Sequence, residues 1–207
     1  MAAELTPGIA AENFGSACLT DRRALRRTLL ARRLALPSAE WAQLSCRVCA
    51  HLRAGFPQLS AMTVGFCWPL NHEPDLRPLI EGWVNERRKG FRALLPVVVA
   101  ADQALAFRAW TPGTVMFADR YGIPTPASGD FLIPEVLLLP VNGFDSAGYR
   151  IGYGGGHFDR TLASLRPRPL AVGVGFELAR LASILPQPHD QPLDAMVTEA
   201  GVFRPCR

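Results

Sequence analysis

The chain has 207 residues, of which 49% are hydrophobic and 19% are charged, and its formal net charge is +4. This hydrophobic content suffices for a buried core and excludes an intrinsically disordered chain, while the longest apolar runs are far shorter than the roughly 20 residues that span a bilayer. The arginines are dispersed and Lys89 is the only lysine. A membrane or nucleic-acid partner is therefore not expected, whereas a small anionic ligand would suit arginine side chains.

The N-terminus and the cysteines indicate the cellular setting. Residues 1–20 have no basic stretch followed by an apolar one, which predicts a loose leader without a secretory signal. Residues 21–207 are expected to form a single α/β catalytic domain. The five cysteines are scattered and odd in number, which predicts reduced thiols in a cytoplasmic protein. Cys46 and Cys49 have CxxC spacing but no second pair at zinc spacing, so they are interpreted as helix thiols.

Leucines at helical spacing predict the first helix. Thr20 or Asp21 is expected to cap it, and it should continue to about Leu36. The residues that form its apolar stripe are Leu25, Leu29, Leu30 and Leu34.

Strands and helices then alternate along the chain. The expected elements are a helix from 38 to 51 or beyond, a strand at 63–68, a helix at 74–88, strands at 91–99 and 105–110, a loop at 111–134, a strand at 136–140, a loop at 141–156, a helix at 157–165, and strands at 170–176 and 195–198. Because the strands are continuously apolar, they predict an α/β fold with a mainly parallel sheet and helices on both faces, a three-layer Rossmann-like architecture. Ligands of such folds lie beyond the carboxyl ends of the strands, so the candidate site is expected in the loops after residues 63–68 and 136–140.

A glycine-rich segment is the most informative part of the second loop. Four of the five residues from Gly152 to Gly156 lack a side chain, and a predicted helix follows directly. Main-chain N–H groups at such a helix start can bind phosphate, although a surface turn is the alternative. The segment lacks the lysine of a P-loop, and His157 stands where a dinucleotide fingerprint needs its last glycine.

The residues around these glycines resemble a known family. Residues 150–160 read RIGYGGGHFDR, which is similar to the RLGxGGGYYDR signature of the 5-formyltetrahydrofolate cyclo-ligases, also called methenyltetrahydrofolate synthetases. The resemblance covers most of the chain from about Arg22 to Thr198. Weaker matches occur in the family's order at residues 22–26, Glu73, residues 122–124, residues 139–145, residues 189–190 and Asp194.

The resemblance implies an enzyme that uses ATP and Mg²⁺ to convert 5-formyltetrahydrofolate to 5,10-methenyltetrahydrofolate, with release of ADP and phosphate. It implies ATP contacts at Arg22, Arg26, Arg150, Ile151, Gly152, Tyr153, Gly154, Gly155, Gly156, His157 and Phe158. It implies folate contacts at Arg26, Trp68, Glu73, Tyr153 and His157. It also implies catalytic roles for Arg150, Tyr153 and His157, and Mg²⁺ ligands in Asp159 and Asp190.

Spacing alone leaves structural alternatives open for these residues. Arg22 and Arg26 could form a solvated basic helix face, and Asp159 could be an acid in the first turn of a helix. Glu73 could be an exposed loop acid, and Trp68 a core residue at a strand end.

Two positions depart from the family pattern. His157 replaces the usual tyrosine and could titrate near neutral pH, or it could simply pack at the helix start. Arg22 replaces the usual lysine, which keeps the charge but changes the donor geometry.

Two other functions remain open at this point. The chain could be a non-catalytic relative that binds a nucleotide, a folate or RNA, or a sugar-phosphate isomerase or CoA-transferase of similar architecture, because fold alone does not fix function. The oligomeric state is not indicated by the sequence.

Overall fold

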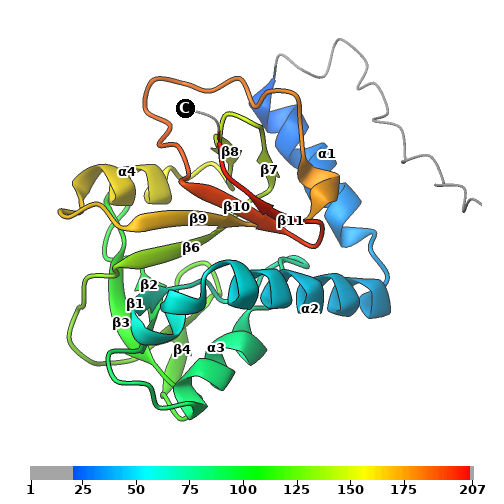
Figure 1. The fold of residues 1–207 in the computed structure, drawn as a ribbon. Coiled ribbons are helices and arrows are strands. Elements are labelled where there is room, and N and C mark those ends of the chain that lie inside the picture. Colours follow the sequence, from blue (N-terminus) through cyan, green and yellow to red (C-terminus); the bar gives the residue numbers. More distant parts are fainter. Residues whose placement is uncertain (1–20, 206–207) are drawn as a thin grey trace, which may run out of the picture.

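A computed structural model describes residues 21–205 and places strands from both halves of this range in one sheet (Figure 1). The strand order is β11-β10-β9-β6-β1-β2-β3. These strands are β1 (Thr63–Gly65), β2 (Arg92–Val97), β3 (Ala106–Trp110), β6 (Val136–Pro140), β9 (Leu170–Val174), β10 (Ala195–Thr198) and β11 (Gly201–Phe203). Parallel pairing joins β10, β9, β6, β1 and β2, whereas the edge strands β3 and β11 pair antiparallel with their neighbours. The predicted mainly parallel sheet is confirmed.

Helices cover both faces of this sheet. The covering helices are α2 (Ser38–Gly55), α3 (Arg77–Asn85) and α4 (His157–Ser164); the structure also has α1 (Arg22–Leu34) and the short 3₁₀ helices η1 (Pro57–Ala61) and η2 (Glu177–Ala179). Leu52 of α2 and Ile80 of α3 share a core with Leu138 of β6 on one face. On the other face, Leu162 of α4 belongs to a second core with Leu139. The predicted three-layer, Rossmann-like architecture is therefore confirmed (Figure 1).

The sequence of β6 explains its central position. Its residues from Val136 to Leu139 are all buried. Leu138 belongs to the core on the α2 and α3 side, and Leu137 to the core on the α4 side, because successive side chains of a strand point to opposite faces. A strand covered on both faces must be apolar at successive positions, and each buried leucine contributes about 1.5–3 kcal/mol.

Helix α1 packs away from the main cores. Its start is the predicted one, since the Asp21 side chain accepts a hydrogen bond of 2.8 Å from the N–H of Arg23. Leu25 and Leu29 form a small core that includes Ile151. Helix α1 therefore lies against the segment that carries the glycine-rich loop.

The predicted apolar stripe of α1 is wrong at its C-terminal end. Leu34 is 47% exposed, whereas Arg33 is buried at 4% exposure. Arg33 follows Leu25 and Leu29 at four-residue steps, which places all three side chains on one helix face. A charged residue therefore occupies the buried end of this face.

Two segments predicted as loops contain short strands. The segment 111–134 holds the hairpin of β4 (Met116–Ala118) and β5 (Pro124–Pro126), and the segment 141–156 holds the ribbon of β7 (Gly143–Phe144) and β8 (Arg150–Ile151). Both turns are closed by an aspartate: Asp119 accepts hydrogen bonds from two main-chain N–H groups of its turn, and so does Asp145. Strands this short carry no alternating pattern that a sequence could reveal.

Some element boundaries also differ from the prediction. Strand β1 ends at Gly65, so Trp68 lies in the following loop and not at the end of a strand. Helix α3 begins at Arg77, whose N–H donates to the Asp75 side chain at 3.0 Å. The prediction did not include β11, which pairs with β10 alone.

The sheet topology defines where a ligand should bind. From β1 the strands continue through β2 to β3 on one side, and from β6 through β9 to β11 on the other. The order thus reverses between β1 and β6, and ligands of such folds bind beyond the carboxyl ends of the strands at this point. We call this space the switch-point crevice; it lies between the loop 66–76 and the loop 141–156.

The predicted leader of residues 1–20 lies outside the described residues. Between residues 21 and 205, no helix is long and apolar enough to cross a membrane.

Candidate active site

The glycine-rich loop ends at the start of α4, as predicted. Gly156 caps the helix in a left-handed conformation with φ of 63°, and the first N–H groups of α4 have no acceptor within the helix. Gly154 has φ of 102°, and a Cβ at this position would lie 3.3 Å from the Arg26 guanidinium. The loop needs glycine there, and its main chain offers donors for an anion.

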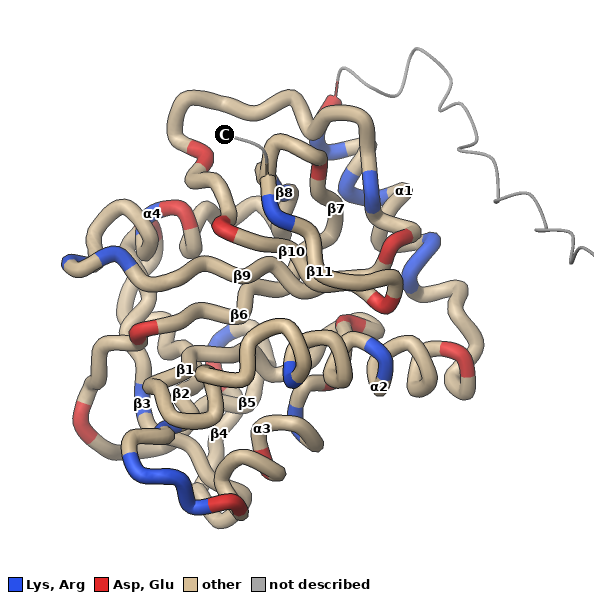
Figure 2. The backbone as a smooth tube through the Cα atoms, in the orientation of Figure 1, with Lys and Arg blue, Asp and Glu red and all other residues tan. Residues whose placement is uncertain are grey.

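Three arginines from two elements, α1 and β8, lie around this loop. Arg26 of α1 donates from Nε to the Gly152 carbonyl at 2.6 Å. Arg150 of β8 donates to Asp159 at 3.0 Å, and Arg22 of α1 donates to Asp190 at 2.6 and 3.2 Å. Figure 2 shows the basic residues of α1 beside the β7–β8 ribbon.

The arginines and carboxylates form one connected group. Gln191 donates its N–H to Asp159 at 2.9 Å and accepts from Arg150 at 2.8 Å through its carbonyl. Since Gln191 follows Asp190 directly, the ion pairs Arg22–Asp190 and Arg150–Asp159 are linked through the main chain. The structure thus brings together four residues that the sequence predicted for the ATP and Mg²⁺ sites.

Both carboxylates are already engaged with protein donors. Asp190 accepts from Arg22 with both oxygens and from the Gln187 N–H at 2.7 Å. Burial alone would raise the pKa of Asp190, but the hydrogen bonds from Arg22 and Gln187 outweigh it and hold this pKa below its usual range. The hydrogen bonds to Asp159 fall on Oδ1, so its Oδ2 is the oxygen better able to accept a further partner.

Asp159 and Asp190 could hold Mg²⁺ only together with oxygens of a bound ligand or water. Within residues 21–205, no three His, Cys, Asp or Glu side chains converge to hold a metal ion. Mg²⁺ is commonly bound by one or two carboxylates together with substrate phosphates and water. Asp159 suits this role through Oδ2, whereas Asp190 would have to share its oxygens with Arg22.

Glu73 is buried on the other side of the crevice. It is 3% exposed, so the alternative of an exposed loop acid is wrong. Its Oε2 accepts from the Leu70 N–H at 3.0 Å, and its carbonyl accepts from the Trp41 indole at 2.9 Å. Burial raises the pKa of Glu73, and Arg33, the Leu70 N–H and the Tyr153 hydroxyl oppose this rise.

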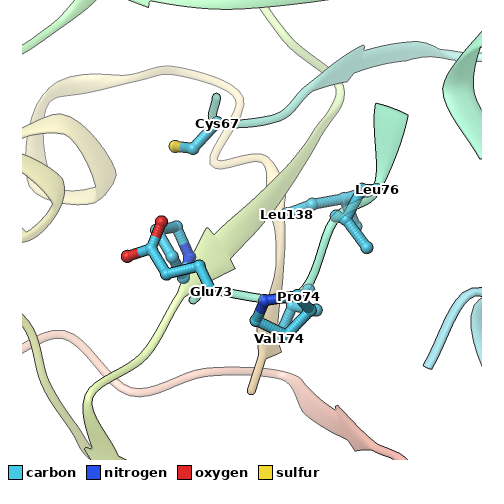
Figure 3. A pocket seen from close by; sticks show the side chains of 7 residues that line it. Cys67, Glu73, Pro74, Leu76, Leu138 and Val174 are labelled. Atoms are coloured by element: carbon cyan, nitrogen blue, oxygen red, sulfur yellow. The ribbon is translucent and has the colours of Figure 1, made fainter. Parts of the chain in front are cut away.

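A small cavity adjoins Glu73 (Figure 3). Glu73 and Cys67 lie at one end, with Leu138 among the apolar side chains of its wall. Burial, followed by the charge of Glu73, raises the pKa of the Cys67 thiol, which stays protonated. The cavity volume is about 10 Å³, which is room for one water molecule but not for a pterin ring.

Arg33 joins the two sides of the crevice, and the sequence-based site did not include it. Its Nη2 donates to the Tyr153 hydroxyl at 2.8 Å and lies 4.0 Å from Glu73 Oε1. Tyr153 as a residue is 46% exposed while its hydroxyl turns inward, and burial together with Glu73 raises the pKa of Tyr153 to about 12. The signal that could have revealed Arg33 is its place on the face of Leu25 and Leu29.

Other predicted site residues have limited freedom to contact a ligand. The Ile151 side chain is fully buried, so only its main chain can contact ATP, whereas the Phe158 side chain is half-buried beside the α4 core. Trp68 packs edge-on against Trp110, and the Arg77 guanidinium lies 4.9 Å from the centre of its ring. This arrangement favours packing over folate stacking at Trp68.

His157 is anchored at the start of α4. Its Nδ1 lies 3.1 Å from the Gln103 carbonyl oxygen, a contact in which Nδ1 must carry the proton. Nε2 is then the ring nitrogen that can meet a ligand. This contact favours a packing role for His157 and leaves one nitrogen for a second partner.

Comparison with known proteins identifies the family. The profile of the 5-formyltetrahydrofolate cyclo-ligase family matches residues 19–199. The chain belongs to this family. The 5-formyltetrahydrofolate cyclo-ligase of Escherichia coli K12 is 29% identical over 180 residues, which are 83% of this chain and 97% of the relative. The cyclo-ligase of Mycoplasma pneumoniae is 23% identical over 182 residues, which are 86% of this chain and 99% of the relative.

Solved structures agree with this membership of the cyclo-ligase family. The 5,10-methenyltetrahydrofolate synthetase of Aquifex aeolicus superposes with a TM-score of 0.77 at 27% identity, covering 90% of this chain and 93% of that structure. The synthetase of Mycoplasma pneumoniae shares the fold with a TM-score of 0.69 at 23% identity, covering 87% of this chain and 99% of that structure.

Proposed function

We propose that this cyclo-ligase family member converts 5-formyltetrahydrofolate and MgATP to 5,10-methenyltetrahydrofolate, ADP and phosphate. The observation that supports the proposal is the linked group of Arg22, Arg150, Asp159 and Asp190 beside a glycine-rich helix start. This group could bind a phosphate and its metal ion, and the buried carboxylate of Glu73 lies across the same crevice.

The nucleotide phosphates are proposed to lie on the main chain of Gly152–Gly156, with Arg26 and Arg150 beside them. The N–H groups of the loop and of α4 supply donors that need no side-chain reorganisation. Arg22 would turn from Asp190 toward a phosphate, because a phosphate oxygen accepts the same forked pair of donors.

Mg²⁺ is proposed to be held by Asp159 and by phosphate oxygens, with Asp190 joining once Arg22 has left it. When bound, the ion would neutralise charge that develops on the transferred phosphoryl group. Arg150 holds the Asp159 carboxylate in place through its hydrogen bond.

The folate is proposed to meet Glu73 and Tyr153. A carboxylate accepts two hydrogen bonds from the amide and amino edge of a pterin, and a phenol offers a donor and a ring face. The cavity beside Glu73 holds about one water molecule, so binding must widen the crevice.

The chemistry needs positioning more than a nucleophile on the protein. The formyl group of the substrate is an amide, whose oxygen is a poor leaving group. Transfer of the γ-phosphoryl group of ATP to this oxygen makes it a good one. N10 of the same folate then attacks the formyl carbon and closes the ring, the N10 proton is lost to phosphate or water, and phosphate departs. The protein contributes by aligning the two substrates and excluding water.

The test is the near-ultraviolet absorbance of the methenyl product. Purified protein mixed with 5-formyltetrahydrofolate and MgATP should produce a steady rise, and omission of ATP or chelation of Mg²⁺ should abolish it. A folded protein that gives no ATP-dependent rise would sink the proposal in favour of a binding-only relative. Turnover without ATP would instead support the isomerase or transferase alternative.

A further inference from the structure

Arg33 occupies the switch-point crevice itself. Its Nε donates to the Asn71 carbonyl at 2.8 Å, in the loop after β1, and its Nη1 lies 3.3 Å from the Val141 carbonyl, directly after β6. The guanidinium therefore bridges the two loops at the point where the strand order reverses. It reaches this point from the last turn of α1.

The remaining nitrogen of Arg33 contacts the two candidate folate residues. Nη2 donates to the Tyr153 hydroxyl at 2.8 Å and lies 4.0 Å from Glu73 Oε1. Glu73 and Tyr153 belong to loops that are far apart in the sequence. The Arg33 guanidinium thus contacts both side chains and both loops, and Asn71 Nδ2 adds a weaker direct hydrogen bond of 3.4 Å to the Tyr153 hydroxyl.

The loop before Glu73 has an unusual backbone conformation at the residue that Arg33 contacts. Asn71 and His72 have φ values of 48° and 57°, a left-handed conformation that residues other than glycine adopt infrequently. In this conformation the Asn71 carbonyl accepts the hydrogen bond from Arg33 Nε. The same turn directs Glu73 inward, where Arg33 opposes the rise in its pKa caused by burial.

A buried guanidinium requires partners for its charge and its donors. All three nitrogens of Arg33 have one, and each partner belongs to the crevice. An arginine needed only to anchor α1 could have used the solvent or a single carbonyl. The contacts instead form a single rigid support for the two side chains that face the ligand.

We propose that Arg33 is a positioning residue, which fixes the Glu73 carboxylate and the Tyr153 hydroxyl relative to each other for the folate. It does not itself react. The identity of the ligand rests on the proposed function, whereas the coupling of the two loops does not.

The kinetic test compares Arg33→Met with Arg27→Met on the same helix. Methionine keeps the length of the side chain and removes its charge and donors, and Arg27 is exposed. Arg33→Met should raise the KM for 5-formyltetrahydrofolate about 10- to 100-fold, the loss expected for hydrogen bonds to a charged group. The KM for ATP and kcat should change less than about threefold, and Arg27→Met should resemble the wild type. An equal rise in both KM values would overturn the proposal.

The structural test needs no substrate. Hydrogen exchange of residues 68–74 and 150–154 should accelerate at least about tenfold in Arg33→Met, while the strands of the sheet keep their protection. This result stands even if the wild type proves inactive as a cyclo-ligase, so failure of the two proposals can be told apart. Unchanged exchange in either loop would show that Arg33 does not couple them.

A second pair of variants changes the side chains less and therefore tests the coupling even if Arg33→Met does not fold. Arg33→Lys keeps the charge near Glu73 but loses the fork that joins the loops. Tyr153→Phe removes only the hydroxyl, which contacts Arg33, Asn71 and Glu73. In a double-mutant cycle the two changes should be non-additive in the KM for folate. Additive effects would overturn the proposed coupling.

Discussion

The two loops that leave the sheet at β1 and β6 carry the candidate site, but they are stabilised in different ways. The loop after β1 buries Glu73 and fixes it by Leu70, Trp41 and Arg33. The Gly152–Gly156 loop after β6 is largely exposed and is held from outside by arginines that bond its carbonyls.

This difference suits two kinds of ligand. A planar, neutral pterin edge is recognised by few hydrogen bonds of fixed direction, which favours a rigid carboxylate. Phosphates are recognised by charge and by main-chain donors, which tolerate exchange of partners. The ion pairs Arg22–Asp190 and Arg150–Asp159 supply such exchangeable partners beside the glycine loop. We therefore expect the Glu73 carboxylate to keep its orientation while the crevice widens around it, and the ion pairs of the nucleotide side to exchange partners on binding.

The largest effect is expected from Asp159→Asn. Loss of the carboxylate should lower kcat at least about 100-fold, because the charge that would hold Mg²⁺ is removed. The amide oxygen can still accept from Gln191, but the buried Arg150 loses its counter-charge, so the free energy of unfolding should fall by about 1–2 kcal/mol while the fold survives. Asp130→Asn, at an exposed position, is the control in the absorbance assay. A variant that melts much earlier but retains full specific activity would assign Asp159 a structural role.

The second largest effect is expected from Glu73→Gln. The KM for 5-formyltetrahydrofolate should rise about 10- to 100-fold, because a charged acceptor is replaced by a neutral one. The KM for ATP should change little, and Glu40→Gln on the exposed surface of α2 should match the wild type. If the KM for ATP rose more than that for folate, the assignment of the two sides of the crevice would be reversed.

Asp190→Asn should lower the free energy of unfolding by about 1–2 kcal/mol at neutral pH, since the Arg22 pair is largely buried. The folded state depresses the pKa of Asp190, so this stabilisation is fully present above the unfolded pKa of about 3.9. The stabilisation is lost as the pH falls through the lower pKa that Asp190 has in the folded state. Denaturant unfolding at several pH values should show the difference between wild type and variant shrinking only below about pH 4. A constant difference across this range would mean that the ion pair is not its source.

The smallest effect is expected from His157→Phe. The ring keeps its packing at the start of α4 and loses only the contact with the Gln103 carbonyl, so kcat/KM should fall less than about threefold. The pH profile of the wild type near neutrality should also persist in the variant. A larger loss together with a changed profile would establish His157 as a chemical participant and would sharpen the description of the nucleotide side.

The sequence by itself determined the fold class and the family. The continuous apolar run 136–140 predicts a strand covered on both faces, and it became β6 at the centre of the sheet. The glycines before His157 predict an anion-binding helix start, and they became the cap of α4. Both features are local, because periodicity and missing side chains act over a few residues. The predicted roles of the site residues, the leader and the cytoplasmic location stay predictions.

Tertiary structure alone decided which side chains meet. Arg33 appeared in the sequence as one more arginine in a basic helix, and only packing of α1 on β8 buried it between Glu73 and Tyr153. Glu73 could equally have been an exposed loop acid until the Leu70 and Trp41 contacts enclosed it. The strands β4, β5, β7 and β8 could not be predicted either, because two or three residues are too few to show an alternation of apolar and polar side chains. Such contacts join residues far apart in the chain, and spacing along a sequence carries information only about neighbours.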